Sequence, residues 1–175
     1  MQSIIDFVGN DVEKKNLASS WMRSNYLEKT HEVDTEMIAE FCELLRTSLR
    51  KGIHTYTPLE WLSYLKSAQQ NRLKQILDVD QYEMVFIPIV ENKHFFSIHI
   101  HVMDPCIYIL DPLYVNLNED HQKHLTFVKF LDNAWTSYYV KNNPKQDNTY
   151  DCGVYMAKYL EYWGKNEKLP FNKVK

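Results

Sequence analysis

The sequence predicts an α+β domain, because helical patterns come first, short apolar strands follow, and helical patterns return at the end. A helical period begins at Asp34, and apolar runs between residues 84 and 110 have the length and turn spacing of strands. The chain has 175 residues and shows neither a repeat nor a linker. We therefore expect residues 1–175 to form a single domain, with a lead-in at residues 1–30 and a core at residues 31–165.

Two helices are expected before the strands. The stretch DTEMIAEFCELLRTSL has Asp34 as its N-cap and a single apolar stripe, formed by Met37, Ile38, Phe41, Leu44 and Leu45. The second helix begins at TPLEWLSYL, where Thr57 and Glu60 form a capping box and Pro58 takes the first helical position. Its pattern extends to about Leu77.

Three strands are expected next. MVFIPIV (84–90) is almost continuously apolar, as is typical of a central strand buried on both faces. FFSIHIHVM (95–103) alternates, and CIYIL (106–110) follows the turn at Asp104-Pro105. Two hairpins at this spacing predict an antiparallel or mixed sheet.

Two further helices are expected after the strands. The first is HQKHLTFVKFLDNAWTSYYV (121–140), with a core stripe of Leu125, Val128, Leu131 and Trp135. After a polar loop, CGVYMAKYLEYW (152–163) forms the last helix, with inward-facing side chains at Met156, Leu160 and Trp163.

Composition excludes several classes of partner. With 20 basic and 23 acidic residues the net charge is -3, so no basic excess favours nucleic acid. The apolar runs fall short of the roughly 18 residues that a membrane helix needs, and MQSIIDFVGNDVEKK lacks the features of a signal peptide. The odd count of 3 cysteines, without a CxxC pair, favours reduced thiols. We therefore expect an intracellular protein with neither a nucleic-acid nor a membrane partner.

Local sequence leaves two interpretations of Cys152 open. It stands in QDNTYDCGVY at the expected start of the last helix. A cysteine nucleophile reacts as the thiolate, which a helix N-terminus and a nearby imidazolium both stabilise. A free cysteine is nevertheless more often a small buried hydrophobe, which is how we interpret Cys42 and Cys106.

Partners for a nucleophile lie elsewhere in the chain. His94 occupies the turn ENKHFF, and Asp111 ends the strand that pairs with the one leaving His94, so both side chains are expected at the same end of the sheet. Gln146 lies in the loop before Cys152, where its amide and a backbone N–H could stabilise an oxyanion. Taken singly, Asp111 is more simply a turn residue and Gln146 a polar loop residue.

Two histidine pairs have spacings that metal sites also use. His99 and His101 share a strand face, and His121 and His124 lie three residues apart. Since no third ligand stands at a suitable spacing, we expect all four to be polar surface residues.

Together these residues resemble the Ulp1/SENP family of ubiquitin-like-protein proteases, cysteine peptidases of the C48 type. QDNTYDCGVY matches the family pattern Q-x-N-x-x-D-C-G-V at every fixed position. FIPIVENKHFFSIHI resembles its strand–histidine–strand segment, YILDPL its strand ending in aspartate, and EMIAEFCELL its opening helix. The resemblance covers about residues 30–165, and the chain's compactness is similar to that of transposon-derived members from plants.

The resemblance implies a papain-like, circularly permuted α+β fold and a complete catalytic set. Cys152 would be the nucleophile, His94 the base, Asp111 the residue that orients it, and Gln146 the oxyanion donor. The substrate would be the carbonyl of the C-terminal Gly-Gly of a SUMO precursor or of a SUMO–lysine conjugate. Neither a metal nor an organic cofactor is implied.

The resemblance also implies which residues contact the substrate, which partner the protein binds and where in the cell it acts. Substrate contacts are expected from Phe95, Asp151 and Gly153. SUMO or another ubiquitin-like protein would be the partner of a monomeric enzyme in the nucleus or cytoplasm, the nucleus by resemblance alone.

Two departures concern the tunnel for the di-glycine tail. Phe95 stands where a tryptophan usually follows the catalytic histidine, and the stretch HEVD, which includes Glu32, replaces a W-L-N-D-like stretch. Two alternatives therefore stay open. One is a protease of the same fold for another Gly-Gly-tailed modifier or peptide, and the other is a non-catalytic module that binds a modifier.

Overall fold

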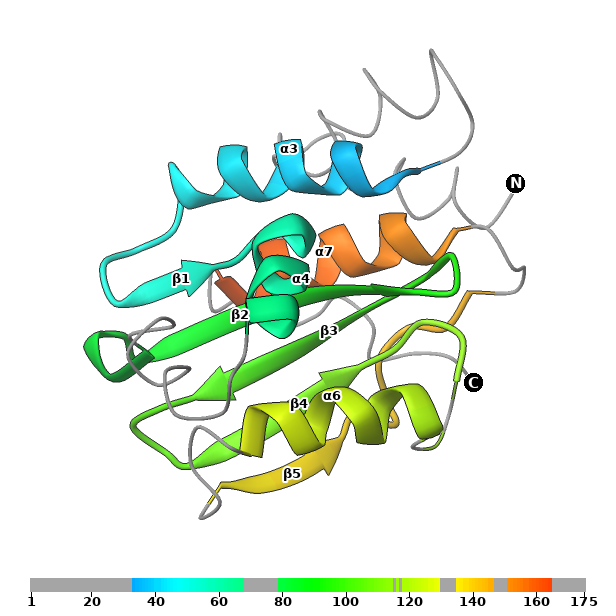
Figure 1. Cartoon of the computed structure of the whole chain (residues 1–175). Helices are drawn as coiled ribbons and strands as arrows, with labels where there is room; N and C mark the ends of the chain where they lie inside the picture. Colours follow the sequence, from blue (N-terminus) through cyan, green and yellow to red (C-terminus); the bar gives the residue numbers. More distant parts are fainter. Residues whose placement is uncertain are drawn as a thin grey trace.

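A mixed five-stranded sheet is the centre of the molecule, with helices on both faces (Figure 1). The computed structural model describes residues 33–67, 79–114, 116, 118–129, 135–146 and 151–164. The described elements confirm the predicted α+β class.

The strands lie in the sheet in the order in which they occur in the chain. They are β1 (Ile53–Thr55), β2 (Met84–Glu91), β3 (His94–His101), β4 (Cys106–Leu110) and β5 (Thr136–Tyr139). The expected hairpins join β2, β3 and β4 in antiparallel fashion, whereas β1 pairs with β2 and β5 with β4 in parallel. The short strand β1 was not predicted, because three residues are too few to show a period.

The first two helices begin where their caps predict. In α3 (Thr35–Arg46), Oδ1 of Asp34 accepts the backbone N–H of Met37 at 2.8 Å. In α4 (Pro58–Ser67), Thr57 and Glu60 form both hydrogen bonds of the capping box. The predicted extension of this helix to Leu77 lies outside the described residues.

The prediction of one long helix over residues 121–140 is wrong. Helix α6 spans Glu119–Lys129, and Thr136–Tyr139 is strand β5. Thr136 is β-branched and Tyr138 and Tyr139 are aromatic, which suits a strand, and pairing with β4 outweighs the helical period that runs through these residues. Trp135 is buried as expected, but it precedes β5 instead of lying on a helix, and Leu131 lies outside the described residues.

Each face of the sheet carries its own hydrophobic core. Helices α3 and α7 (Cys152–Gly164) cover one face, and α4 and α6 cover the other. Strand β3 is therefore buried on both sides, with Phe95 in the core under α7 and Phe96 in the core under α6. Within the described part of the chain, no helix combines the length and the apolar character needed to cross a membrane.

The expectation that four histidines lie on the polar surface is also wrong. His99, His121 and His124 are fully buried, and His101 is half-buried. Each side of the sheet is covered by helices, so polar side chains that alternate along β3 or line α6 become interior. Their polar atoms then need partners inside the protein.

Candidate active site

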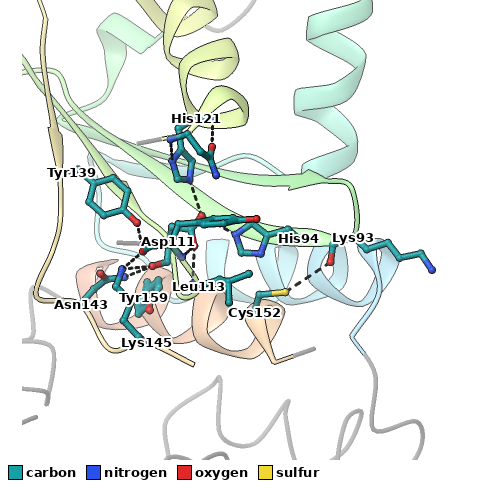
Figure 2. A network of polar contacts seen from close by, with 12 residues as sticks. Lys93, His94, Asp111, Leu113, His121, Tyr139, Asn143, Lys145, Cys152 and Tyr159 are labelled. Carbon is teal, nitrogen blue, oxygen red and sulfur yellow. Dashed lines mark hydrogen bonds and ion pairs between the residues drawn. The ribbon is translucent and has the colours of Figure 1, made fainter. Parts of the chain in front are cut away.

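The turn between β2 and β3 fixes the position of His94. Asn92 and Lys93 form a two-residue hairpin loop and both have positive φ, at 51° and 65°, the conformation of a type I′ turn. A left-handed Lys93 is strained relative to glycine or asparagine, so the surrounding structure must hold it there. The carbonyl of Lys93 lies 3.9 Å from Sγ of Cys152, which is a weak thiol contact (Figure 2).

Cys152 is the first residue of helix α7 and is only 2% exposed. The carbonyl of Asp151 accepts the backbone N–H groups of Val154 and Tyr155, which begins the helix at this cysteine. A Cβ on Gly153 would lie 2.6 Å from Cγ1 of Val33 and 3.6 Å from Cδ2 of Phe95. The glycine therefore lets α7 approach the segment before α3 closely enough to set where Cys152 lies.

His94 connects Cys152 with a buried carboxylate. Nε2 of His94 lies 2.7 Å from Oδ2 of Asp111, which leaves Nδ1 as the ring nitrogen available to Cys152 (Figure 2). This confirms that the two antiparallel strands bring residues 94 and 111 to the same end of the sheet. Burial disfavours the charged imidazole, but hydrogen bonding to Asp111 and Cys152 outweighs it and raises the pKa of His94 to about 9.

The carboxylate of Asp111 is saturated with donors. Oδ1 accepts the backbone N–H groups of Leu113 at 2.7 Å and Tyr114 at 2.9 Å. Oδ2 is shared by His94 and His121, each at 2.7 Å. Burial alone would raise the pKa of Asp111, but these contacts, that of His121 first, hold it far below its usual value. The side chain is therefore a fixed anion behind His94.

A second loop is tied to the one that carries Asp111. The side chains of Asn143 and Lys145 both donate to the carbonyl of Asp111 (Figure 2). Lys145 also donates to the carbonyl of Tyr114. The backbone N–H of Gln146 donates to the carbonyl of Pro112 at 2.8 Å. Burial lowers the pKa of Lys145 to about 8, although the nearby Asp111 opposes that shift. Gln146, itself buried, is thus anchored directly onto the loop behind the acid.

The structure gathers three of the predicted catalytic residues, His94, Asp111 and Cys152, at one end of the sheet. Their catalytic roles, and that of Gln146 as an oxyanion donor, stay predictions. The predicted substrate contacts Phe95, Asp151 and Gly153 are all buried around the start of α7, and their roles likewise stay predictions. Glu32 lies outside the described residues.

Sequence reasoning missed two residues beside this group. His121 was interpreted as a surface residue, yet it contacts Asp111. The ring of Tyr114, which is 41% exposed, packs edge-on against His94 with centroids 5.2 Å apart. Asn118, three residues before His121, was a usable signal for where α6 begins, because its side chain accepts the backbone N–H of His121 as an N-cap.

The arrangement is suited to nucleophilic attack on a carbonyl carbon. It combines a cysteine at a helix start, a histidine of raised pKa and an anionic carboxylate behind that histidine. Among the residues that the structure describes, no group of three His, Cys, Asp or Glu side chains is arranged to hold a metal ion.

Comparison with known proteins agrees with the resemblance seen in the sequence. The model of the Ulp1 protease family, C-terminal catalytic domain, matches residues 4–173. The ubiquitin-like-specific protease ESD4 of Arabidopsis thaliana is 25% identical over 97% of this chain. The chain spans only 37% of the length of that relative.

Solved structures show the same fold. The SUMO protease Ulp1 with an oxidised catalytic cysteine superposes with a TM-score of 0.72 at 18% identity, over 83% of this chain and 72% of that one. The C-terminal Ulp1 protease domain in complex with SMT3, the yeast ortholog of SUMO, gives 0.67 at 18% identity over 80% and 69%. At such identity the likeness establishes the fold alone. The match of the family model over nearly the whole chain establishes that this protein belongs to the Ulp1 protease family.

Proposed function

We propose that this chain is a thiol isopeptidase that cleaves after the C-terminal Gly-Gly of SUMO or a related ubiquitin-like modifier. Cys152 is the nucleophile, His94 the proton carrier, Asp111 the anion that orients His94, and Gln146 the oxyanion donor. The single observation that carries the proposal is the alignment of Cys152, His94 and Asp111 at one end of the sheet.

The proposed reaction begins when Cys152 passes its thiol proton to Nδ1 of His94 and its sulfur attacks the carbonyl carbon of the terminal glycine. The electron pair of the C=O bond moves to oxygen, where the amide of Gln146 and the backbone N–H of Cys152 stabilise it. When the intermediate collapses, the C–N bond breaks and the leaving amine takes a proton from His94. A thioester between Cys152 and the modifier remains.

The second half of the proposed reaction releases the modifier. Water attacks the thioester carbonyl while His94 takes a proton from it. The C–S bond then breaks, and the sulfur of Cys152 takes the proton back from His94. The modifier leaves as a carboxylate after its acid group releases a proton to solvent. Asp111 holds the imidazole in one orientation through both halves and stabilises its charged form.

The choice of a ubiquitin-like substrate rests on relatives and on one solved complex. The Arabidopsis relative is named as a ubiquitin-like-specific protease, and the Ulp1 domain was solved together with the yeast ortholog of SUMO. Both support a ubiquitin-like protein as the substrate of this chain.

A second candidate is a protease for another Gly-Gly-tailed modifier, and one observation favours it. Phe95 stands where family members usually carry tryptophan, and it is only 5% exposed, packed in the core that includes Val33 and α7. A ring held inside the core is a poor cover for a substrate tail. This candidate predicts the same chemistry with a different modifier.

The test is covalent labelling with C-terminal electrophilic probes made from SUMO, NEDD8 and ubiquitin. We expect the SUMO probe to add to wild-type protein at Cys152, and the Cys152→Ser variant to stay unlabelled. Labelling by another probe alone would support the second candidate. If no probe labels Cys152 while SUMO binds in calorimetry, the enzyme proposal fails and a binding module remains.

A further inference from the structure

Asp111 has two histidine partners, of which the proposed mechanism uses only one. Nε2 of His94 and Nε2 of His121 both lie 2.7 Å from the same oxygen, Oδ2 (Figure 2). His121 comes from helix α6 and is fully buried. It cannot reach a substrate as His94 can, so its effect must pass through the carboxylate.

The start of α6 determines which nitrogen of His121 carries the proton. Oδ1 of Asn118 accepts the backbone N–H of His121 at 2.9 Å, and the backbone N–H of Asn118 donates in return to Nδ1 of His121 at 3.2 Å. This is a capping box in which a histidine replaces the usual glutamate at the third helical position. Since Nδ1 accepts a hydrogen bond, Nε2 must carry the proton, and it donates that proton to Asp111.

His121 also completes the surroundings of the carboxylate. An ionised carboxylate has about four acceptor sites. Two are filled by the backbone N–H groups of Leu113 and Tyr114, the third by His94 and the fourth by His121. Without His121, Oδ2 would lose a donor in a site that excludes water, and the carboxylate would be held on that side by His94 alone.

We propose that His121 is a positioning residue that holds Oδ2 of Asp111 and thereby sets both the orientation and the proton affinity of His94. The inference rests on the proposed function for its catalytic meaning. Its structural part is that His121 is a neutral donor to the same oxygen, Oδ2 of Asp111, that His94 contacts. This part can be measured without a substrate.

The other titratable groups near His94 and Asp111 come from several elements of the fold. Cys152 faces His94 from α7, and Lys145 donates to the backbone carbonyl of Asp111, not to its carboxylate. The ring of Tyr139 on β5 lies beside His121 with centroids 5.6 Å apart. The charge of Asp111 contributes to the raised pKa of Tyr159 on α7, after the larger effect of burial. Of the described side chains, His121 and His94 are the donors to Oδ2.

The direction of the effect follows from this geometry. A neutral donor on Oδ2 draws negative charge away from the contact with His94. Removing that donor leaves a more basic carboxylate against the imidazolium, so the pKa of His94 should rise further. At the same time Asp111 loses one of its four restraints, so turnover should fall because the imidazole is less well oriented.

The test compares His121→Phe with the matched control His124→Phe by NMR with ¹⁵N-labelled histidine. Both residues are fully buried on α6 and lie against the ring of Phe96, but His124 contacts Glu91 and the indole of Trp61 instead of Asp111. We expect the titration midpoint of His94 to move to higher pH in His121→Phe and to stay in place in His124→Phe. His121→Gln, whose amide can reach the same oxygen, should return it toward the wild-type value.

Kinetics and the wild-type spectrum complete the test. We expect kcat/KM to fall about 10- to 100-fold in His121→Phe and to recover in large part in His121→Gln. In wild-type protein, His121 should be the neutral tautomer protonated at Nε2. The ¹⁵N spectrum of the wild-type protein shows this tautomer directly, so the measurement stands even if His121→Phe does not fold. A proton at Nδ1 of His121, or the same His94 midpoint in both phenylalanine variants, would overturn the inference. Because these spectra need no substrate, they remain decisive if the modifier probes fail.

Discussion

Strand β3 and helix α7 lie against each other, and the two ends of this pair are built differently. At one end His94 faces Cys152, the first residue of the helix. At the other end His99 lies against the indole of Trp163, near the end of the helix, with ring centroids 4.7 Å apart. Both ends thus place a strand histidine beneath one end of α7.

The two histidines differ in their polar partners. His94 is bound to the anionic Asp111, and its pKa rises to about 9 although burial opposes the charge. His99 contacts the hydroxyl of Ser97 at 2.9 Å and lies against the rings of Phe86 and Trp163. Burial, with a smaller effect of the nearby His101, lowers the pKa of His99 well below the usual value. A buried carboxylate, more than burial itself, therefore decides which end can hold a charged imidazole.

The largest expected effect is at the sulfur. Cys152→Ala should abolish turnover and shift the melting temperature by only a few degrees, because one small side chain is shortened. At the other end of α7, the Trp163→Phe variant should turn over substrate as fast as wild-type protein. Turnover of a fluorogenic SUMO conjugate and thermal melts measure both. A large drop in melting temperature for Cys152→Ala would instead indicate that the thiol is mainly a core residue.

Exchanging each histidine for glutamine should separate chemistry from packing. His94→Gln should lower kcat/KM by about 10²–10⁴-fold, the usual contribution of an acid–base residue. Its loss of stability should fade as the pH rises toward 9. His99→Gln should change kcat/KM by less than about threefold while lowering stability, because it places a longer polar side chain in an aromatic core. Equal losses of activity in the two variants would remove the distinction between the two ends.

The two glycines of α7 give a matched pair of steric tests. A Cβ at Gly153 would lie 2.6 Å from Cγ1 of Val33, and one at Gly164 would lie 2.5 Å from Cδ2 of Leu49. Alanine at either site should cost about 1–3 kcal/mol of unfolding free energy, with more at Gly153 because valine is stiffer.

Activity should distinguish these two glycine variants. Gly153→Ala displaces the turn that carries Cys152 and should lower kcat/KM about 10-fold or more, whereas Gly164→Ala should not. Chemical denaturation and steady-state kinetics supply the numbers. A fully active Gly153→Ala protein would show that the close approach to Val33 does not position the nucleophile.

The pH dependence of stability should also separate the two ends, because His94 and His99 stabilise the fold in opposite pH ranges. The pKa of His94 is raised from 6.5 to about 9, so its contribution is complete below pH 6.5 and is lost as the pH rises through 9. The pKa of His99 is lowered, so its contribution is present above pH 6.5 and is lost at lower pH. We therefore expect denaturation from pH 5 to 9.5 to show two opposite trends in the free energy of unfolding. Wild type should lose its greater stability relative to His94→Gln at high pH, and its greater stability relative to His99→Gln at low pH. Parallel curves would contradict the opposite signs.

The parts of the fold set by local chemistry were predictable. The caps at Asp34 and Thr57 lie where the sequence places them, since each needs only residues three positions away. The approach of His94 to Asp111 also followed from sequence, because the hairpin length fixes the antiparallel register.

What could not be predicted depends on contacts distant in sequence. Strand β5 was hidden because a helical period runs through residues 121–140, and only its pairing with β4 selects the strand. His121 was misassigned for a related reason, since a sequence does not reveal that α6 packs this side chain against Asp111. The charge of His94 likewise depends on partners from β4 and α7.

The most direct test of the account is a histidine NMR titration in which His94 and His99 are followed in the same sample. We predict that His94 stays protonated at pH 8 and titrates near pH 9, while His99 stays neutral down to the onset of acid unfolding. A His94 that titrates at or below pH 6.5, or a His99 that is charged at neutral pH, would contradict the claim that a buried carboxylate makes only one end of this pair reactive.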